Sequence, residues 1–178
     1  MGNSKKARKF QVTIIGSSDS TDEQYKTAYE IASYIAKKGW VLINGGRTGV
    51  MEASSKGVYE NNGISVAILP YDSIDSGNRY STISIPTTIG FARNCITVAS
   101  ADCVVIVGGK SGTLCELTFA WQYNKKIISC AWIEGVSKDY AGKKLDDKRE
   151  DPILKADNLN GVFKLLEIEY MNFKKNNI

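Results

Sequence analysis

Residues 103–123 read CVVIVGGKSGTLCELTFAWQY: an apolar run, a glycine-rich turn and then a helical pattern. The run Cys103–Val107 predicts a buried β-strand, and the pattern from about Thr113 to Tyr123 predicts an α-helix. Between them stands Gly108-Gly109-Lys110-Ser111-Gly112. Glycines permit positive φ and close backbone approach, and the free amides and dipole of a helix N terminus attract anions. The stretch therefore predicts a strand and a helix joined by an anion-binding turn.

A second turn of the same pattern, Gly45-Gly46-Arg47-Thr48-Gly49, joins the expected strand at residues 40–43 to a helix at about 50–60. In a doubly wound sheet, ligands bind beyond the C-terminal ends of the strands, where two such turns can face one another. We therefore predict a phosphate site made by both turns and by one residue of a third segment. Its expected residues are Gly45, Gly46, Thr48, Gly49, Asn94, Gly108, Gly109, Lys110, Ser111, Gly112 and Thr113.

Apolar strands alternate with amphipathic helices along the rest of the chain. Strands are expected at residues 10–15, 40–43, 64–69, 81–85, 103–107, 127–133 and 153–155. The first helix is expected to start with a capping box of Ser20 and Glu23, and the last to cover residues 158–167. This rhythm predicts one doubly wound, Rossmann-like α/β domain over residues 10–178. Its sheet would be mainly parallel, with about six or seven strands and helices on both faces. The charge-mixed segment 134–151 is expected to be a mobile surface loop, and whether it closes over a ligand as a lid stays open at this point.

The composition excludes several kinds of chemistry. The 178 residues contain no histidine, so imidazole bases, His-dependent nucleophiles and His metal ligands are excluded, and we expect no metal site. The net charge of +4 comes from Lys5, Lys6, Arg8 and Lys9, within a basic tail expected to be disordered over residues 1–9. The remainder is neutral, so we expect no nucleic-acid partner. No apolar run reaches the roughly 18 residues of a membrane span, so no membrane partner is expected.

The spacing of the cysteines and the lack of two known nucleotide-binding motifs exclude further classes of protein. The four cysteines form no Cys-x-x-Cys pair and no export signal is seen, which predicts reduced thiols and a cytoplasmic location; Cys115 alone is a candidate for reactivity. A P-loop needs glycine where Val104 stands. The dinucleotide fingerprint is missing after the first strand, which continues as Gly16-Ser17-Ser18-Asp19. These departures disfavour a Mg-ATP enzyme and a dehydrogenase.

Two charged residues are candidates for chemistry beside the turns. Glu116 falls in the first turn of the helix that follows the second glycine turn, where the helix dipole stabilises a carboxylate. Arg93 falls near the start of the preceding helix, a position explained most simply by contact with a phosphate. For Glu116 the structural alternative is a solvent-facing acid in the first helical turn.

The motifs Gly45-Gly46-x-x-Gly49-Val50-Met51-Glu52-Ala53, Arg93-Asn94 and Gly108-Gly109-x-x-Gly112-Thr113-x-x-Glu116 together resemble those of the LOG-like Rossmann proteins of the SLOG superfamily. The resemblance covers about residues 10–167 and is strongest to the short branch that includes molybdenum-cofactor carrier proteins. LOG enzymes are phosphoribohydrolases that cleave the N-glycosidic bond of nucleoside 5'-monophosphates. By resemblance, Glu116 and Arg93 would be catalytic and the chain would form a dimer or tetramer.

Three positions depart from the LOG pattern, and the second glycine turn has one extra residue. Val107 replaces a proline, Asn94 stands where LOG enzymes carry lysine, and Cys115 occupies a position that is often acidic. These changes keep the phosphate cradle and weaken the case for hydrolysis. The sequence therefore predicts a protein that binds a phosphorylated small ligand, with molybdenum cofactor (molybdopterin) as the ligand of a carrier. The alternative is a LOG-type phosphoribohydrolase, which would need no cofactor.

Overall fold

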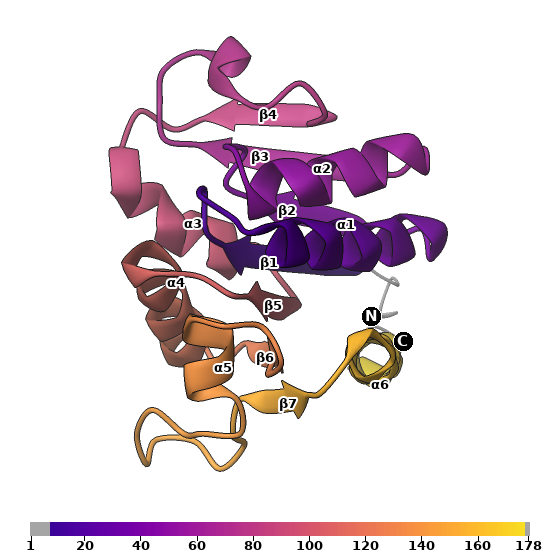
Figure 1. Ribbon diagram of the computed structural model, residues 1–178, viewed down its shortest axis with the longest axis vertical. Helices are drawn as coiled ribbons and strands as arrows, with labels where there is room; N and C mark the ends of the chain where they lie inside the picture. The colour runs from indigo at the N-terminus through magenta and orange to yellow at the C-terminus, as the bar shows by residue number, and fades with distance from the viewer. Residues whose placement is uncertain (1–7, 177–178) are drawn as a thin grey trace, which may run out of the picture.

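The computed structural model describes residues 8–176 and contains one seven-stranded sheet with the order β4-β3-β2-β1-β5-β6-β7 (Figure 1). Every pair of neighbouring strands is parallel. The strands are β1 Gln11–Gly16, β2 Val41–Asn44, β3 Ile64–Leu69, β4 Ile83–Pro86, β5 Cys103–Val107, β6 Lys126–Cys130 and β7 Leu154–Ala156. The predicted single Rossmann-like α/β fold is confirmed.

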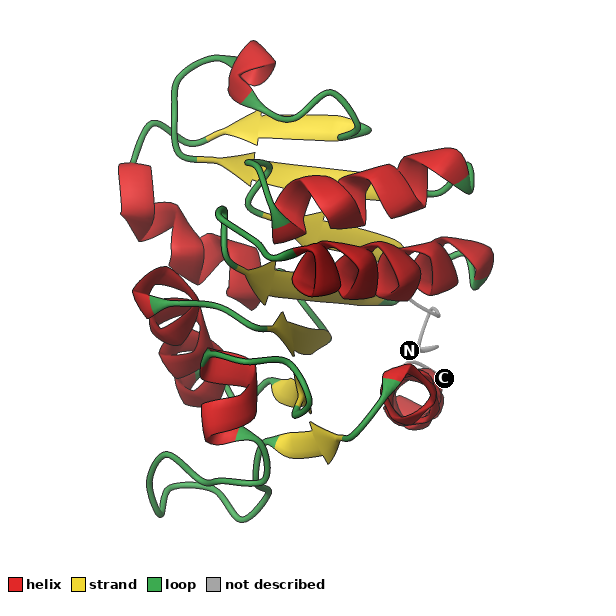
Figure 2. Ribbon diagram, in the orientation of Figure 1, coloured by secondary structure: helices red, strands yellow, loops and turns green. Residues whose placement is uncertain are grey.

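Six α-helices cover the two faces of the sheet (Figure 2). They are α1 Asp22–Lys37, α2 Val50–Glu60, α3 Arg93–Ala99, α4 Ser111–Gln122, α5 Val136–Tyr140 and α6 Leu159–Asn176, with 3-10 turns η1 Ile74–Ser76 and η2 Gly90–Ala92. Helices α1, α2 and α6 share one apolar core with the sheet, whereas α3, α4 and α5 share the other. Within these described residues, no helix is both long and apolar enough to cross a bilayer.

The strands feed both cores because successive side chains point to opposite faces of a sheet. Along β5, Val105 packs into the core of α1 and α2, whereas Val104 and Ile106 pack into the core of α3 and α4. All five residues of this strand are buried. A continuous apolar run is thus what a central parallel strand with helices on both sides requires.

Several predicted boundaries move. The capping box uses Thr21 and Gln24 in place of Ser20 and Glu23, because α1 starts at Asp22. Helix α6 continues beyond residue 167 to Asn176. This extension brings Tyr170 and Phe173 against the Phe10 ring, at centroid distances of 5.7 and 5.3 Å, so aromatic packing stabilises the longer helix.

The segment 134–151, which was predicted to be a loop, differs from the prediction. Within 134–151 the structure has helix α5, and its later part packs on α4, where the Trp121 indole N–H donates to Asp146 at 2.9 Å. Of the expected tail, residues 1–7 lie outside the described part of the chain. Arg8, near the end of that tail, donates two hydrogen bonds to the Asp102 carboxylate, at 2.6 and 2.7 Å.

Candidate functional site

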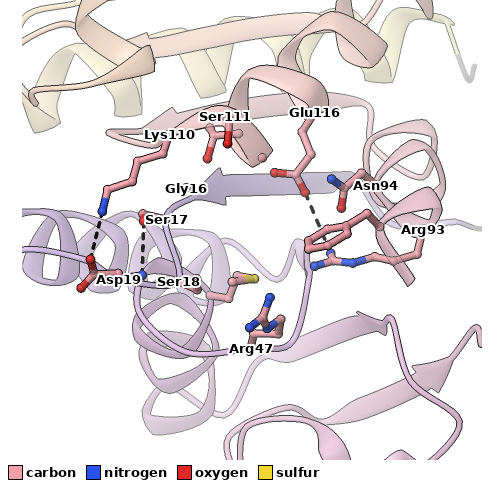
Figure 3. Close-up of a pocket in the computed structure, with 14 residues that line it drawn as sticks. Gly16, Ser17, Ser18, Asp19, Arg47, Arg93, Asn94, Lys110, Ser111 and Glu116 are labelled. Carbon is pink, nitrogen blue, oxygen red and sulfur yellow. Dashed lines mark hydrogen bonds and ion pairs between the residues drawn. The ribbon is translucent and has the colours of Figure 1, made fainter. Parts of the chain in front are cut away.

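A cavity of about 360 Å³ lies over the C-terminal ends of β1 and β5 (Figure 3). These neighbouring strands lead to helices on opposite faces, α1 and α4, and such a switch point opens a crevice in doubly wound sheets. The cavity is lined by Gly16, Ser17, Ser18, Asp19, Arg47, Met51, Phe91, Arg93, Asn94, Lys110, Ser111, Gly112, Thr113 and Glu116. The structure thus brings together seven of the thirteen residues that the sequence predicted for the site.

The N terminus of α4 opens into this cavity. The helix begins at Ser111, and its N-cap residue Lys110 makes no side-chain capping bond. The amides of the first helical turn have no carbonyl partner within a helix, and Ser111, Gly112 and Thr113 all line the cavity. Uncapped amides and the positive end of the helix dipole favour an anion at this point.

The glycine pair before α4 shapes the turn from behind the cavity wall. Gly108 and Gly109 have φ angles of +59° and +102°, which side chains with a Cβ rarely adopt. The Gly108 amide donates to the Ser137 hydroxyl at 2.9 Å, and the Val136 amide donates to the Gly109 carbonyl at 3.1 Å. Neither glycine lines the cavity. Helix α5, which lies in the segment predicted to be a mobile loop, therefore holds this turn in position, and no residue of 134–151 lines the cavity.

The glycines of the first turn lie in tightly packed surroundings, outside the cavity lining. Gly45, Gly46, Thr48 and Gly49 do not line the cavity, although all four were expected to contact phosphate. A Cβ on Gly45 would lie 2.1 Å from the Arg93 Nη1 atom, and one on Gly49 would lie 2.5 Å from the Ser17 carbonyl oxygen. These glycines allow close packing behind the wall. Arg47 is the residue that this turn places in the cavity.

Arg93 and Glu116 meet at the floor of the cavity (Figure 3). Arg93 Nη1 lies 3.9 Å from Glu116 Oε1, and the two residues are only 5% and 8% exposed. Burial raises the pKa of Glu116 to about 7, and the nearby positive charge of Arg93 partly offsets this rise. Burial also lowers the pKa of Arg93. Its Nε–H is buried with no hydrogen-bond partner among the described residues. The pair is thus a buried cation beside a carboxyl that titrates near neutral pH.

Positive side chains dominate the cavity wall. Lys110 Nζ bonds to the exposed Asp19 carboxylate at 2.9 Å, and such an exposed pair is weak. The Arg47 guanidinium forms no ion pair or hydrogen bond within residues 8–176. With Arg93, the wall carries three cationic side chains and two carboxyl groups. One of these carboxyl groups, that of Glu116, is partly protonated at neutral pH because its pKa is about 7. This balance suits an anionic ligand.

A model of the SLOG cluster4 family matches residues 9–162, a range that contains every residue of the cavity. The chain belongs to the SLOG cluster4 family. An uncharacterised protein of Archaeoglobus fulgidus is 44% identical over 120 residues, which cover 67% of this chain and 79% of that protein.

Solved structures are similar to this SLOG cluster4 chain over most of its length. The structural-genomics target TM1055 is 31% identical with a TM-score of 0.83, covering 89% of this chain and 98% of its own. The molybdenum cofactor binding protein of Rippkaea orientalis is 29% identical with a TM-score of 0.80, covering 91% and 98%. The molybdenum cofactor carrier protein of Chlamydomonas reinhardtii is 27% identical with a TM-score of 0.81, covering 92% and 99%. DNA processing protein A of Helicobacter pylori, 19% identical with a TM-score of 0.65 over 90% and 81%, shares the fold alone.

Half of the cavity wall in this SLOG cluster4 chain was missed by sequence reasoning. The missed residues are Gly16, Ser17, Ser18, Asp19, Arg47, Met51 and Phe91. The first four of these residues could have been predicted from the sequence. They follow the first strand, which is central in a doubly wound sheet, and ligands bind beyond the ends of the central strands. A Cβ on Gly16 would lie 2.6 Å from the Val107 carbonyl oxygen, so this glycine lets the ends of β1 and β5 approach. Cys115 is exposed and lies outside the wall.

Proposed function

We propose that the cavity binds the phosphate group of a small ligand at the N terminus of α4. The observation that carries this proposal is the uncapped first turn of that helix, which lines a cavity beside Arg47, Arg93 and Lys110. Backbone amides at a helix N terminus and guanidinium groups are the donors that phosphate oxygens accept best. Asn94 and the Ser111 hydroxyl add neutral polar groups to the same wall.

We further propose that the ligand is molybdenum cofactor and that the chain acts as its carrier. The similarity to proteins named as molybdenum cofactor binding or carrier proteins supports this choice. The donor set also fits, because the cofactor's pterin bears a phosphate group and a helix N terminus with free cations suits that group. The cavity volume of about 360 Å³ is within the ordinary range for small-ligand sites, roughly 300–1,000 Å³.

Cofactor loading tests the carrier proposal. The purified protein is incubated without oxygen with cofactor released from a molybdoenzyme, and molybdenum is measured in the protein fraction after gel filtration. We expect roughly equimolar molybdenum for the wild type and for Lys175→Gln, which removes an exposed cation at the far end of α6. Arg47→Gln should retain much less. A wild-type fraction without molybdenum would overturn the carrier proposal.

Phosphoribohydrolysis is the second candidate function, and the Glu116 carboxyl favours it. A group with a pKa of about 7 is present in both protonation states at neutral pH. Its protonated form can donate to a departing base, and its carboxylate can stabilise the positive charge that develops on the ribose ring. Arg93, at 3.9 Å, would orient the ligand beside it.

A panel of nucleoside 5'-monophosphates tests this second function through the release of free base. If the chain is a hydrolase, Glu116→Gln should lose turnover while it keeps its affinity for the nucleotide. The opposite result, no base released from any member of the panel by the wild type, would sink the hydrolase function and leave the binding proposal intact.

We also propose that the chain forms a homo-oligomer, either a dimer or a tetramer. The edge strand β4 exposes Ile83 and Ile85, and the following segment exposes Ile89 and Phe91. An exposed group of large apolar side chains supports a protein interface. Sedimentation of the wild type should show more than one chain, and Ile85→Arg should shift the population toward the monomer. A monomeric wild type at high concentration would overturn this proposal.

A further inference from the structure

A second cavity of about 410 Å³ adjoins the phosphate cavity, and Arg47 lines both of them. It is lined by Arg47, Thr48, Glu52, Tyr71, Ser76, Gly77, Asn78 and Arg79. Arg47 and Thr48 follow β2, and Tyr71 follows β3, so this cavity lies over the C-terminal ends of those two strands. A ligand anchored at α4 can therefore extend past Arg47 along the same edge of the sheet.

Asn78 fixes the wall of this second cavity to the first glycine turn. Its amide N–H donates to the Gly46 carbonyl at 2.8 Å, and its side-chain Nδ2 donates to the Arg47 carbonyl at 3.1 Å. Its Oδ1 atom accepts from the Tyr80 amide at 3.1 Å. The segment that contains Asn78 is thus tied to the turn that carries Arg47, and a wall built in advance lowers the cost of ordering on binding.

Glu52 is the acid in the lining of this cavity. It is half-buried in the first turn of α2, and its carboxylate takes part in no hydrogen bond or ion pair within residues 8–176. The guanidinium of Arg79, on the same wall, is instead bonded to the Tyr80 hydroxyl at 2.7 Å. Two carboxylate oxygens of Glu52 are therefore available to accept hydrogen bonds from a ligand.

We infer that this second cavity takes a 2-amino-4-oxopyrimidine ring, the ring that guanine and pterins share; this inference rests on the proposed phosphate site. Such a ring presents an N–H and an adjacent amino group, two donors in a row that match the two oxygens of Glu52. Tyr71 adds an aromatic side chain to the wall of this second cavity. Arg47 contacts the part of the ligand that links ring and phosphate.

Other purine rings fit the Glu52 carboxylate less well. Hypoxanthine keeps the ring N–H but lacks the amino group, and adenine places a ring nitrogen lone pair where the N–H should be. A bidentate pair to a base edge gives roughly tenfold or greater discrimination. The cavity should therefore prefer GMP to IMP, and IMP to AMP.

Calorimetric titration with ribose 5-phosphate, GMP, IMP and AMP tests the inference. We expect the wild type to bind GMP at least about tenfold more tightly than IMP. In Glu52→Gln the ratio of the two affinities should fall to about one. The matched control is Glu60→Gln, an acid in the last turn of the same helix and outside the cavity, and it should keep the wild-type ratio.

The outcomes separate the two proposals. Binding of ribose 5-phosphate with equal affinities for GMP and IMP overturns the inference alone, as does a GMP preference that survives Glu52→Gln. An equal loss of all ribonucleotides in Glu52→Gln also overturns it, because Glu52 would then bind ribose hydroxyls. Failure of ribose 5-phosphate itself to bind overturns the phosphate site, and the inference with it. Neopterin phosphate distinguishes the two sources of the ring: tighter binding than GMP assigns the cavity to pterins, and weaker binding assigns it to guanine nucleotides.

Discussion

The two Gly-Gly-x-x-Gly turns share a sequence pattern and a place after a parallel strand, yet their helix N termini differ. At the first turn, the Val50 amide at the start of α2 donates to the Ser17 carbonyl at 3.0 Å, and the Gly46 amide donates to the Asn44 side chain at 2.8 Å. The protein itself satisfies these donors. Neither α2 nor α4 has a side-chain cap. At the second turn, however, no carbonyl within residues 8–176 accepts from the amides of Ser111, Gly112 and Thr113, and these residues line a cavity.

Under the proposed function, a glycine turn before a helix binds phosphate only where the amides of that helix remain free. The first turn instead packs Gly45 against Arg93 and presents the Arg47 side chain. The second turn leaves its helix open because the hydrogen bonds of Gly108 and Gly109 go to α5, on the side away from the cavity. One turn thus supplies charge and support, and the other supplies backbone donors.

The ion pair between Arg93 and Glu116 is where the two turns meet, and it predicts the largest effect. The folded state raises the pKa of Glu116 from 4.5 to about 7, so it holds this proton more tightly than the unfolded chain does. Stability from this group is therefore full below about pH 4.5 and falls by about 3 kcal/mol as pH rises through 7. Urea unfolding of wild type and Glu116→Gln at several pH values measures it. The wild type should lose stability relative to the variant as pH rises, whereas parallel curves would contradict the raised pKa.

Alanine substitution at one glycine of each turn should distinguish the tightly packed first turn from the open second turn. A Cβ on Gly45 would lie 2.1 Å from Arg93 Nη1, whereas one on Gly112 meets nothing within 4 Å. Overpacking of this kind costs about 2 kcal/mol, and a change in open space costs within about 0.5 kcal/mol. We expect Gly45→Ala to lower the free energy of unfolding by the larger amount and Gly112→Ala to leave it nearly unchanged. Equal losses in the two variants would mean that the turns are alike.

A single amide can be deleted from the open helix with little change to the fold. Ser111 is the first residue of α4, a position that tolerates proline, and Lys110 before it is extended, as the residue before a proline prefers. Ser111→Pro should weaken binding of ribose 5-phosphate about tenfold, the value of one charge-assisted hydrogen bond. Ser111→Ala, which removes only the hydroxyl, is the control in the same calorimetric titration. Equal affinities of the two variants would show that this amide does not hold phosphate.

The fold was predictable because its signal is local. Runs such as Cys103–Val107 are buried on both faces, so they read as apolar strands without knowledge of their neighbours. The second turn, Glu116 and Arg93 were also found from the sequence, since each stands at a fixed place relative to a helix start. Residues 134–151 were wrongly predicted to be a loop throughout, because the charged segment shows no apolar periodicity. Helix α5 has only five residues and is held by tertiary hydrogen bonds, so it gives no such pattern.

The sequence could not show which backbone N–H groups at the two turns would already be hydrogen-bonded within the folded chain. Asn44 reads as a turn residue, yet its side chain binds the Gly46 amide and three atoms of α2. The Ser17 carbonyl, which closes the N terminus of α2, comes from a loop well before it in the chain. The Ser17 contact depends on the packing of β1 beside β2, so the local pattern around α2 does not by itself distinguish the closed turn from the open one.

Amide chemical shifts during titration with ribose 5-phosphate test whether phosphate binds at the open N terminus of α4. We expect the backbone N–H signals of Ser111, Gly112 and Thr113 to shift progressively as phosphate binds, while those of Gly46 and Val50 stay in place because their donors are already satisfied. Shifts confined to residues 45–50, or no shift at the start of α4 at saturating ligand, would contradict it.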